Sequence, residues 1–163
     1  MSPTLPEMPR WNKGSEVIER LLDARHLERV PADADTVAAL LATAERHVTS
    51  AESTAHTDPE GAFSLAYDAE RKTATALLAH QGLRPTSSGG HIVIVDAMTA
   101  QFPGVDGLKS IDRLRRRRNQ AEYPDPQNYD PVTPAEVHDA IAAARAALDA
   151  AGKLIGVPQL GIF

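Results

Sequence analysis

The segment Arg113–Pro124 concentrates the side chains best suited to binding an anion. It reads RLRRRRNQAEYP and holds five arginines, four of them consecutive, followed by Asn119 and Tyr123. Between Lys109 and Arg118 six cations and one anion give a charge of +5, so the remaining residues carry −10 in a chain of net charge −5. Guanidinium groups form paired hydrogen bonds with phosphate and carboxylate. We therefore expect an anionic group to bind here.

Helical geometry separates these arginines into different directions. At about 100° per residue, an apolar stripe runs along one face of the expected helix, formed by Leu108, Ile111 and Leu114. Arg118 continues that stripe near its centre, whereas Arg115 and Glu122 lie at its edges and Asn119 lies further round. The other three cations, Arg113, Arg116 and Arg117, point elsewhere. Arg118 is therefore expected to face the protein rather than the solvent.

A structural explanation for Arg118 stands beside the binding one. A charge that faces a core needs a partner, and Glu122 lies four residues on, within reach on a helix. Arg118 and Glu122 can therefore be a structural ion pair, and a run of basic residues is often a solvated face. On an earlier helix, Tyr67 and Arg71 are expected to line the same groove as Arg118.

No other part of the sequence carries a recognisable catalytic or cofactor pattern. Three histidines are scattered across three of the expected elements, and we interpret each as a surface or packing residue: His80, His91 and His138. Three aspartates fit caps and turns better than metal ligands: Asp58, Asp125 and Asp130. No phosphate loop, dinucleotide fingerprint or zinc spacing is present, so we expect neither a metal nor a cofactor.

Composition predicts a single helical domain. The chain has 163 residues, 42% of them hydrophobic but only 4% aromatic, and it contains no cysteine. Alanine-rich amphipathic stretches favour closely packed helices. No apolar run approaches the roughly 18 residues that a membrane span requires, and the N-terminus does not resemble a signal peptide. We expect a cytoplasmic protein that does not associate with membranes, and the negative net charge argues against one that coats duplex DNA.

Hydrophobic periodicity and capping residues place about six helices. We expect them from Ser15 to before Pro31, from Asp33 or Asp35 through Ala51, from Asp58-Pro59 to Gly82, from Ile92 to Phe102, from about Asp106 to Tyr123, and from Thr133-Pro134 to Gly156. The run Ile92–Val95 is the one candidate strand, and helical spacing beyond it favours a helix. The predicted fold is all-α, an antiparallel bundle of four or five core helices. The predicted domain is 15–156, with a flexible arm over 1–14 and a tail over 157–163.

The arginine helix and the segments before it resemble a HEPN domain. Four stretches carry the resemblance: Arg118-Asn119 near a helix end, Leu114-Arg115 before it, Ala66–Lys72 leading to Leu77-Leu78, and Gly82–Thr86 continuing to Gly89-Gly90-His91. The similar region covers roughly Asp58 to Ile155. The resemblance implies a helical homodimer of a toxin–antitoxin or defence system that cleaves RNA without a metal. It also implies a nucleotidyltransferase or other antitoxin as a partner.

The family motif is an arginine, a polar residue, and a histidine four to six positions after the arginine. Arg118 and Asn119 match, but the aligned histidine position is Tyr123, and no histidine occurs between His91 and His138. A tyrosine, with a pKa near 10, is poorly suited to proton transfer at neutral pH, although it can bind a phosphate or stack on a base. The resemblance implies Arg118, Asn119 and Tyr123 as catalytic candidates. The expected RNA or nucleotide contacts are Arg115, Arg116, Arg117, Glu122, Tyr67 and Arg71.

Three functions remain open from the sequence. The first is an RNA- or nucleotide-binding HEPN protein, with ribonuclease activity if a substitute for the histidine exists. The second is a catalytically inactive HEPN bundle that acts as a regulatory or binding partner. The third is an interaction domain unrelated to nucleic acid.

Overall fold

The computed structural model describes residues 9–163, and these residues form six helices and one two-stranded sheet. The helices are α1 (Ser15–Asp23), α2 (Ala34–Thr54), α3 (Pro59–His80), α4 (Gly90–Gln101), α5 (Ile111–Glu122) and α6 (Pro134–Ile155). The strands are β1 (Leu27–Arg29) and β2 (Leu83–Pro85). The predicted all-α bundle is confirmed.

The long helices begin where side chains satisfy their free backbone N–H groups. Asp33 accepts hydrogen bonds from the N–H groups of Asp35 and Thr36 at the start of α2, and Asp58 accepts one from Gly61 at the start of α3. At α6 a capping box pairs the Thr133 side chain with the Glu136 N–H, and the Glu136 side chain with the Thr133 N–H. These three predicted helix starts are confirmed.

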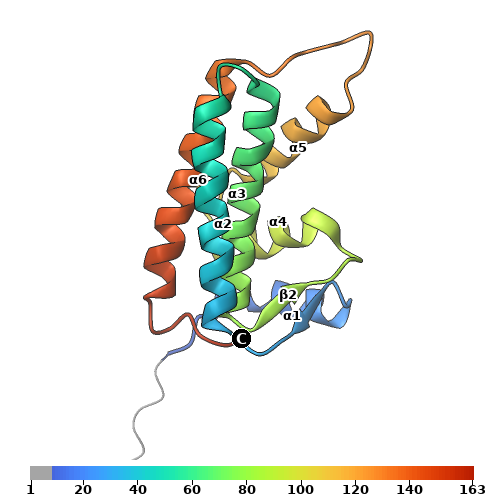
Figure 1. Ribbon diagram of the computed structural model, residues 1–163. Coiled ribbons are helices and arrows are strands. Elements are labelled where there is room, and N and C mark those ends of the chain that lie inside the picture. Colours follow the sequence, from blue (N-terminus) through green and yellow to red (C-terminus); the bar gives the residue numbers. More distant parts are fainter. Residues whose placement is uncertain (1–8) are drawn as a thin grey trace, which may run out of the picture.

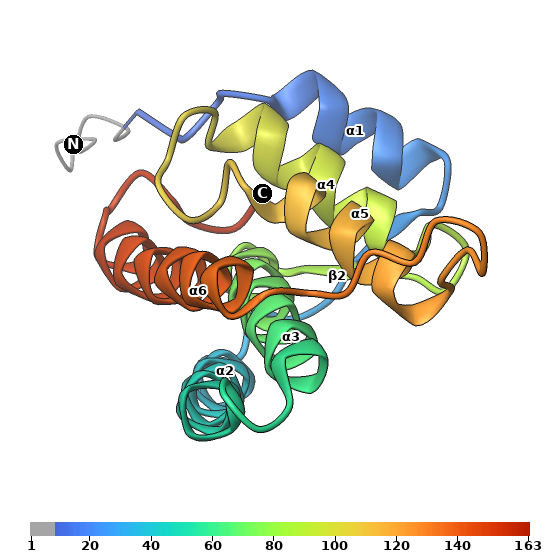
Figure 2. The same cartoon turned by 90° about the horizontal axis from the view of Figure 1, so that it is seen from above.

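Helix α3 is the centre of the bundle. Helices α2 and α6 run beside it as two further long helices, and α4 and α5 contact it from another side (Figure 1). Seen from above, α1, α4 and α5 gather on that side, opposite α2 (Figure 2). Eleven residues of α3 are buried, because α2 and α6 pack against it on one side and α4 and α5 on the other.

Two local expectations were wrong. The sheet was not predicted: β1 and β2 pair antiparallel, with Glu28 opposite Arg84, although each strand is only three residues long. The arginine helix begins at Ile111 rather than near Asp106. Gly104 and Gly107 have φ angles of +75° and +85° in the preceding turn, and this backbone cannot continue a right-handed helix.

Both described ends of the chain contact the bundle. In the expected arm, residues 1–8 lie outside the described part, while Trp11 lies against Phe102 with ring centroids 5.4 Å apart. In the expected tail, Leu160 is buried and the Phe163 N–H donates to the Gln81 carbonyl over 3.0 Å. Over residues 9–163, no helix combines the length and the apolar character needed to cross a membrane.

Candidate functional site

Helix α5 carries the arginines along the side of α3. Ile111 and Leu114 are buried on its inner face, as the apolar stripe predicted. The chain reaches α5 through Gly107, where an added Cβ would lie only 2.2 Å from the backbone nitrogen of Ala147 in α6. This close approach holds the turn before α5 against α6.

Arg118 faces the protein at the end of the apolar stripe. Its guanidinium carbon lies 5.8 Å from the centre of the Tyr67 ring on α3, within the range of a cation–π contact. Its Nη2 is 2.8 Å from Oε1 of Glu122, so the ion pair anticipated from the spacing is present. Its Nε atom is buried and has no hydrogen-bond partner among the described residues. Arg118 therefore has both an acidic partner and an unused donor.

Tyr67 joins Arg118 to a histidine that the sequence did not assign to the site. Tyr67 is only 2% exposed, and its hydroxyl lies 2.8 Å from Nδ1 of His91 at the start of α4. Burial raises the pKa of Tyr67 to about 12, although the charges of Arg71, Arg118 and Arg115 oppose this. The phenol therefore stays protonated at neutral pH.

His91 stays neutral for a related reason. Its pKa is lowered, first by burial and then by the positive charges of Arg71 and Arg118, with a smaller effect from Arg115, against the raising effect of Asp68. The three arginines thus act on both Tyr67 and His91. We call this group the Tyr67 cluster: Tyr67, Arg71, His91, Arg115 and Arg118.

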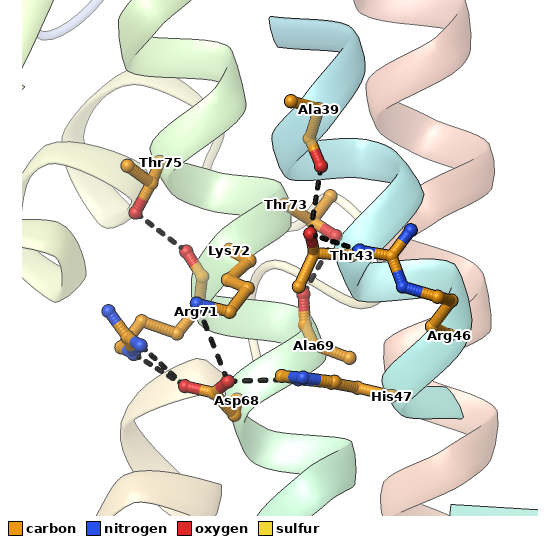
Figure 3. Close-up of polar contacts among 10 residues, drawn as sticks. All are labelled: Ala39, Thr43, Arg46, His47, Asp68, Ala69, Arg71, Lys72, Thr73 and Thr75. Carbon is orange, nitrogen blue, oxygen red and sulfur yellow. Dashed lines mark hydrogen bonds and ion pairs between the residues drawn. The ribbon is translucent and has the colours of Figure 1, made fainter. Parts of the chain in front are cut away.

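Arg71 is held in the Tyr67 cluster by Asp68, one turn earlier on α3. Asp68 accepts hydrogen bonds from Nε and Nη2 of Arg71, and Nδ1 of His47 on α2 lies 2.9 Å from its other oxygen (Figure 3). Lys72 lies 3.7 Å away. Burial raises the pKa of Asp68, but Arg71, Lys72 and His47 outweigh it and lower the pKa overall. Asp68 is therefore an ionised anchor for Arg71 and not a free base.

Arg115 and Arg116 share one carboxylate but lie in different surroundings. Nη2 of Arg115 is 2.8 Å from Oδ1 of Asp112, and Nε of Arg116 is 2.9 Å from Oδ2. The Arg115 side chain is 16% exposed and the Arg116 side chain is 71% exposed. Only Arg115 belongs to the Tyr67 cluster.

The remaining predicted residues lie on other faces of α5. Arg117 binds both carboxylate oxygens of Glu136 on α6, with Nε 2.8 Å from Oε1. Tyr123 is 80% exposed and lines a pocket of about 400 Å³ beside the loop from α5 to α6, together with Arg117, Gln120 and Tyr129. The lining of this pocket includes neither Arg118 nor Tyr67, and Asn119 is exposed. The structure does not gather Asn119 and Tyr123 with Arg118.

The sequence did not assign His91 to the site because the family motif places its histidine after the arginine that matches Arg118. His91 precedes Arg118 in the chain and enters the cluster from another helix. The signal available was its position after Gly89-Gly90 at a helix start, but nothing in the spacing linked it to Tyr67. Within residues 9–163, no group of three or more histidine, aspartate or glutamate side chains is arranged to hold a metal ion.

The Tyr67 cluster combines guanidinium donors with a neutral imidazole. Guanidinium groups from two helices can bind the oxygens of one phosphate, and a neutral imidazole can accept a proton. Compared with known proteins, the chain matches no family model, no curated protein and no solved structure.

Proposed function

We propose that this protein binds RNA or a nucleotide through a phosphate at the Tyr67 cluster. The observation that carries the proposal is the contact of the Arg118 guanidinium with the nearly buried Tyr67 ring, whose hydroxyl lies against His91. Arg71 and Arg115 add positive charge that lowers the pKa values of both Tyr67 and His91. The HEPN resemblance at Arg118-Asn119 agrees with this chemistry. It also suggests a cytoplasmic homodimer in a toxin–antitoxin or defence system, with a nucleotidyltransferase or other antitoxin as a partner.

The acidic partners of these arginines do not oppose binding strongly. Arg118 is 27% exposed and Glu122 is 37% exposed, and helical i,i+4 pairs of this kind contribute only about 0.3–0.5 kcal/mol. A phosphate that accepts two hydrogen bonds from one guanidinium can replace such a partner.

A second candidate function is a catalytically inactive HEPN-like bundle that serves as a regulatory or binding partner. One observation favours it: each of the four consecutive arginines has a carboxylate partner, namely Asp112 for Arg115 and Arg116, Glu136 for Arg117, and Glu122 for Arg118. In this alternative the arginines stabilise α5 and attach it to α6. The binding of RNA would then not depend on Arg118.

Replacing Arg118 distinguishes the two candidates. We expect Arg118→Ala to weaken binding of a single-stranded RNA oligonucleotide by about tenfold or more, because it removes a charge-assisted contact of roughly 1.5–3 kcal/mol. Fluorescence anisotropy measures the affinity, and thermal unfolding monitors stability. Arg145→Ala is the matched control, since Arg145 pairs with Glu52 on the α2–α6 side of the bundle. Unchanged affinity together with a lowered melting temperature would favour the structural alternative.

A further inference from the structure

The pocket of about 400 Å³ beside Tyr123 is bordered by the end of α5, the loop that follows it and the first turn of α3, and we call it the loop pocket. The loop crosses to the end of the bundle where α3 and α6 begin (Figure 1). Two tyrosines and three carboxylates contribute to the lining: Tyr123, Tyr129, Glu60, Asp125 and Asp130. The loop pocket shares no residue with the Tyr67 cluster, so it is a separate feature of the surface.

The charge around the loop pocket is mainly negative and is not balanced by the protein itself. Arg117 is the only cation among the described lining residues, and it binds both carboxylate oxygens of Glu136. Its Nη2 is 3.7 Å from the nearer carboxylate oxygen of Asp130. Within residues 9–163, neither Glu60 nor Asp125 forms an ion pair. Carboxylates without a cationic partner in a concave surface attract a cation.

Two of the three tyrosines in the chain line the loop pocket. Tyr67 is buried in the bundle, whereas Tyr123 is 80% exposed and Tyr129 is 64% exposed. Packing therefore does not account for these two rings. The face of a tyrosine ring attracts a cation, and tyrosine is enriched at protein–protein interfaces. Exposed rings beside unpaired carboxylates suit a cationic group that is carried by another protein.

The loop that carries these side chains is shaped by its own contacts. Asp125 accepts a hydrogen bond from the Gln127 N–H over 2.9 Å, and Nη2 of Arg117 donates to the Asp130 carbonyl over 3.1 Å. Three of the nine residues 123–131 are prolines, which restrict the backbone. A pocket that is already formed loses less conformational entropy when a ligand binds.

We propose that the loop pocket binds an arginine side chain on the surface of a partner protein. A guanidinium fits better than an ammonium, because its planar face stacks on a tyrosine ring and its N–H groups form paired hydrogen bonds with a carboxylate. The exposed tyrosine rings also offer contacts to the partner residues on either side of the arginine. RNA is disfavoured here, since its phosphates are repelled by the same carboxylates. The proposal does not depend on RNA binding at the Tyr67 cluster.

An NMR titration of the ¹⁵N-labelled protein tests the proposal, with N-acetyl-arginine amide as the probe. N-acetyl-citrulline amide is the control, because citrulline has nearly the same shape as arginine without its charge. We expect the arginine probe to give saturable shifts at the backbone amides of residues 123–132, and the citrulline probe to bind at least about fivefold more weakly. The acetylated and amidated peptide Gly-Ser-Arg-Ser-Gly should bind at least as tightly as the arginine probe, because the tyrosine rings contact its flanking residues.

Variants of the lining residues identify the groups that bind the probe. The double variant Tyr123→Leu, Tyr129→Leu should weaken binding by about tenfold, and it should bind RNA as wild type does. Asp125→Asn keeps an acceptor for the Gln127 N–H but removes the charge, so it should weaken binding by about two- to fivefold. Asp139→Asn is the matched control, because it removes the same charge at an exposed position of α6. Its affinity for the probe should stay within about 1.5-fold of wild type at physiological salt.

Four results would overturn the proposal. The first is an arginine probe that shifts no amide of residues 123–132, or that binds no better than the citrulline probe. The second is a peptide that binds more weakly than the arginine probe, which would limit the loop pocket to a small molecule. The third is an equal loss from Asp125→Asn and Asp139→Asn, which would assign binding to the net charge. The fourth is a single-stranded RNA that shifts the same amides, with that binding lost in the double tyrosine variant, which would assign the rings to base stacking.

Discussion

Glu70 is a buried carboxyl group on α3, between Tyr67 and Arg71 in the sequence. Its side chain is 0% exposed, and Oγ of Ser110 lies 3.5 Å from each of its carboxylate oxygens. Burial raises its pKa from 4.5 to about 8, against the opposing effects of Ser110 and Arg113. The folded protein therefore holds this proton more tightly than the unfolded chain. The contribution of Glu70 to the free energy of unfolding is therefore fully present below pH 4.5 and falls as the pH rises toward 8.

Replacing Glu70 with glutamine should remove this pH dependence. Glutamine resembles the protonated carboxyl and can still accept from Ser110. At pH 5 the variant and wild type should have similar free energies of unfolding, while at pH 8 the variant should be more stable by on the order of a few kcal/mol. Urea unfolding at both pH values measures the difference. Glu45→Gln, at an exposed position of α2, should change the free energy of unfolding at neither pH. If Glu70→Gln also differs from wild type by the same amount at pH 5 and at pH 8, Glu70 is already ionised in the folded protein.

At the scale of elements, the position of α5 decides which arginines form the site. The turn from Pro103 to Ser110 brings α5 against α3, and Gly107 contacts the backbone of Ala143 and Ala147 in α6. A larger residue there must move α5 or α6. Movement of α5 would carry Arg115 and Arg118 away from Tyr67.

Two glycine substitutions separate backbone strain from this packing. Gly104 and Gly107 both have positive φ angles, but an added Cβ at Gly104 meets nothing within 4 Å, whereas at Gly107 it would lie 2.6 Å from Cα of Ala147. Gly104→Ala should cost about 1–2 kcal/mol from the left-handed backbone alone. Gly107→Ala should cost more, and should also weaken RNA binding. Denaturant unfolding and anisotropy measure both effects, and equal costs for the two variants would contradict the packing argument.

The sequence predicted those elements whose signals are local. Asp33, Asp58 and Thr133 cap helices within three residues of their own positions, and the Arg118–Glu122 pair follows from helical spacing. The pairing of β1 with β2 joins segments 56 residues apart and leaves no pattern in two three-residue strands. The contact of Tyr67 with His91 likewise depends on the packing of α4 against α3, which periodicity does not specify.

At the scale of the whole molecule, the described C-terminal residues close one end of the bundle. Leu160 is 2% exposed, and Nε2 of His80, at the end of α3, donates to its carbonyl over 2.8 Å. Residues 157–163 are therefore part of the fold and continue the core beyond α6. They lie away from the arginine residues of α5, at the opposite end of α3.

Truncating Leu160 should lower stability without affecting the site. Leu160→Ala should cost about 2–5 kcal/mol, the range for a buried leucine. Ile162→Ala is the matched control, because Ile162 is 64% exposed and exposed substitutions usually change stability by less than about 0.5 kcal/mol. Chemical denaturation measures both, and RNA affinity at low denaturant should equal that of wild type for each variant. Equal stability of the two variants would show that residues 157–163 contribute little to the core.

The central claim is that a phosphate group binds at Arg71, Arg115 and Arg118, and the salt dependence of RNA binding tests it most directly. One phosphate neutralised at the cluster contributes about −0.7 to the slope of log affinity against log salt concentration on a single strand. Arg118→Ala should weaken binding and make this slope less steep, by up to about 0.7. An affinity that does not change with salt, or a slope that is the same in wild type and Arg118→Ala, would contradict the assignment.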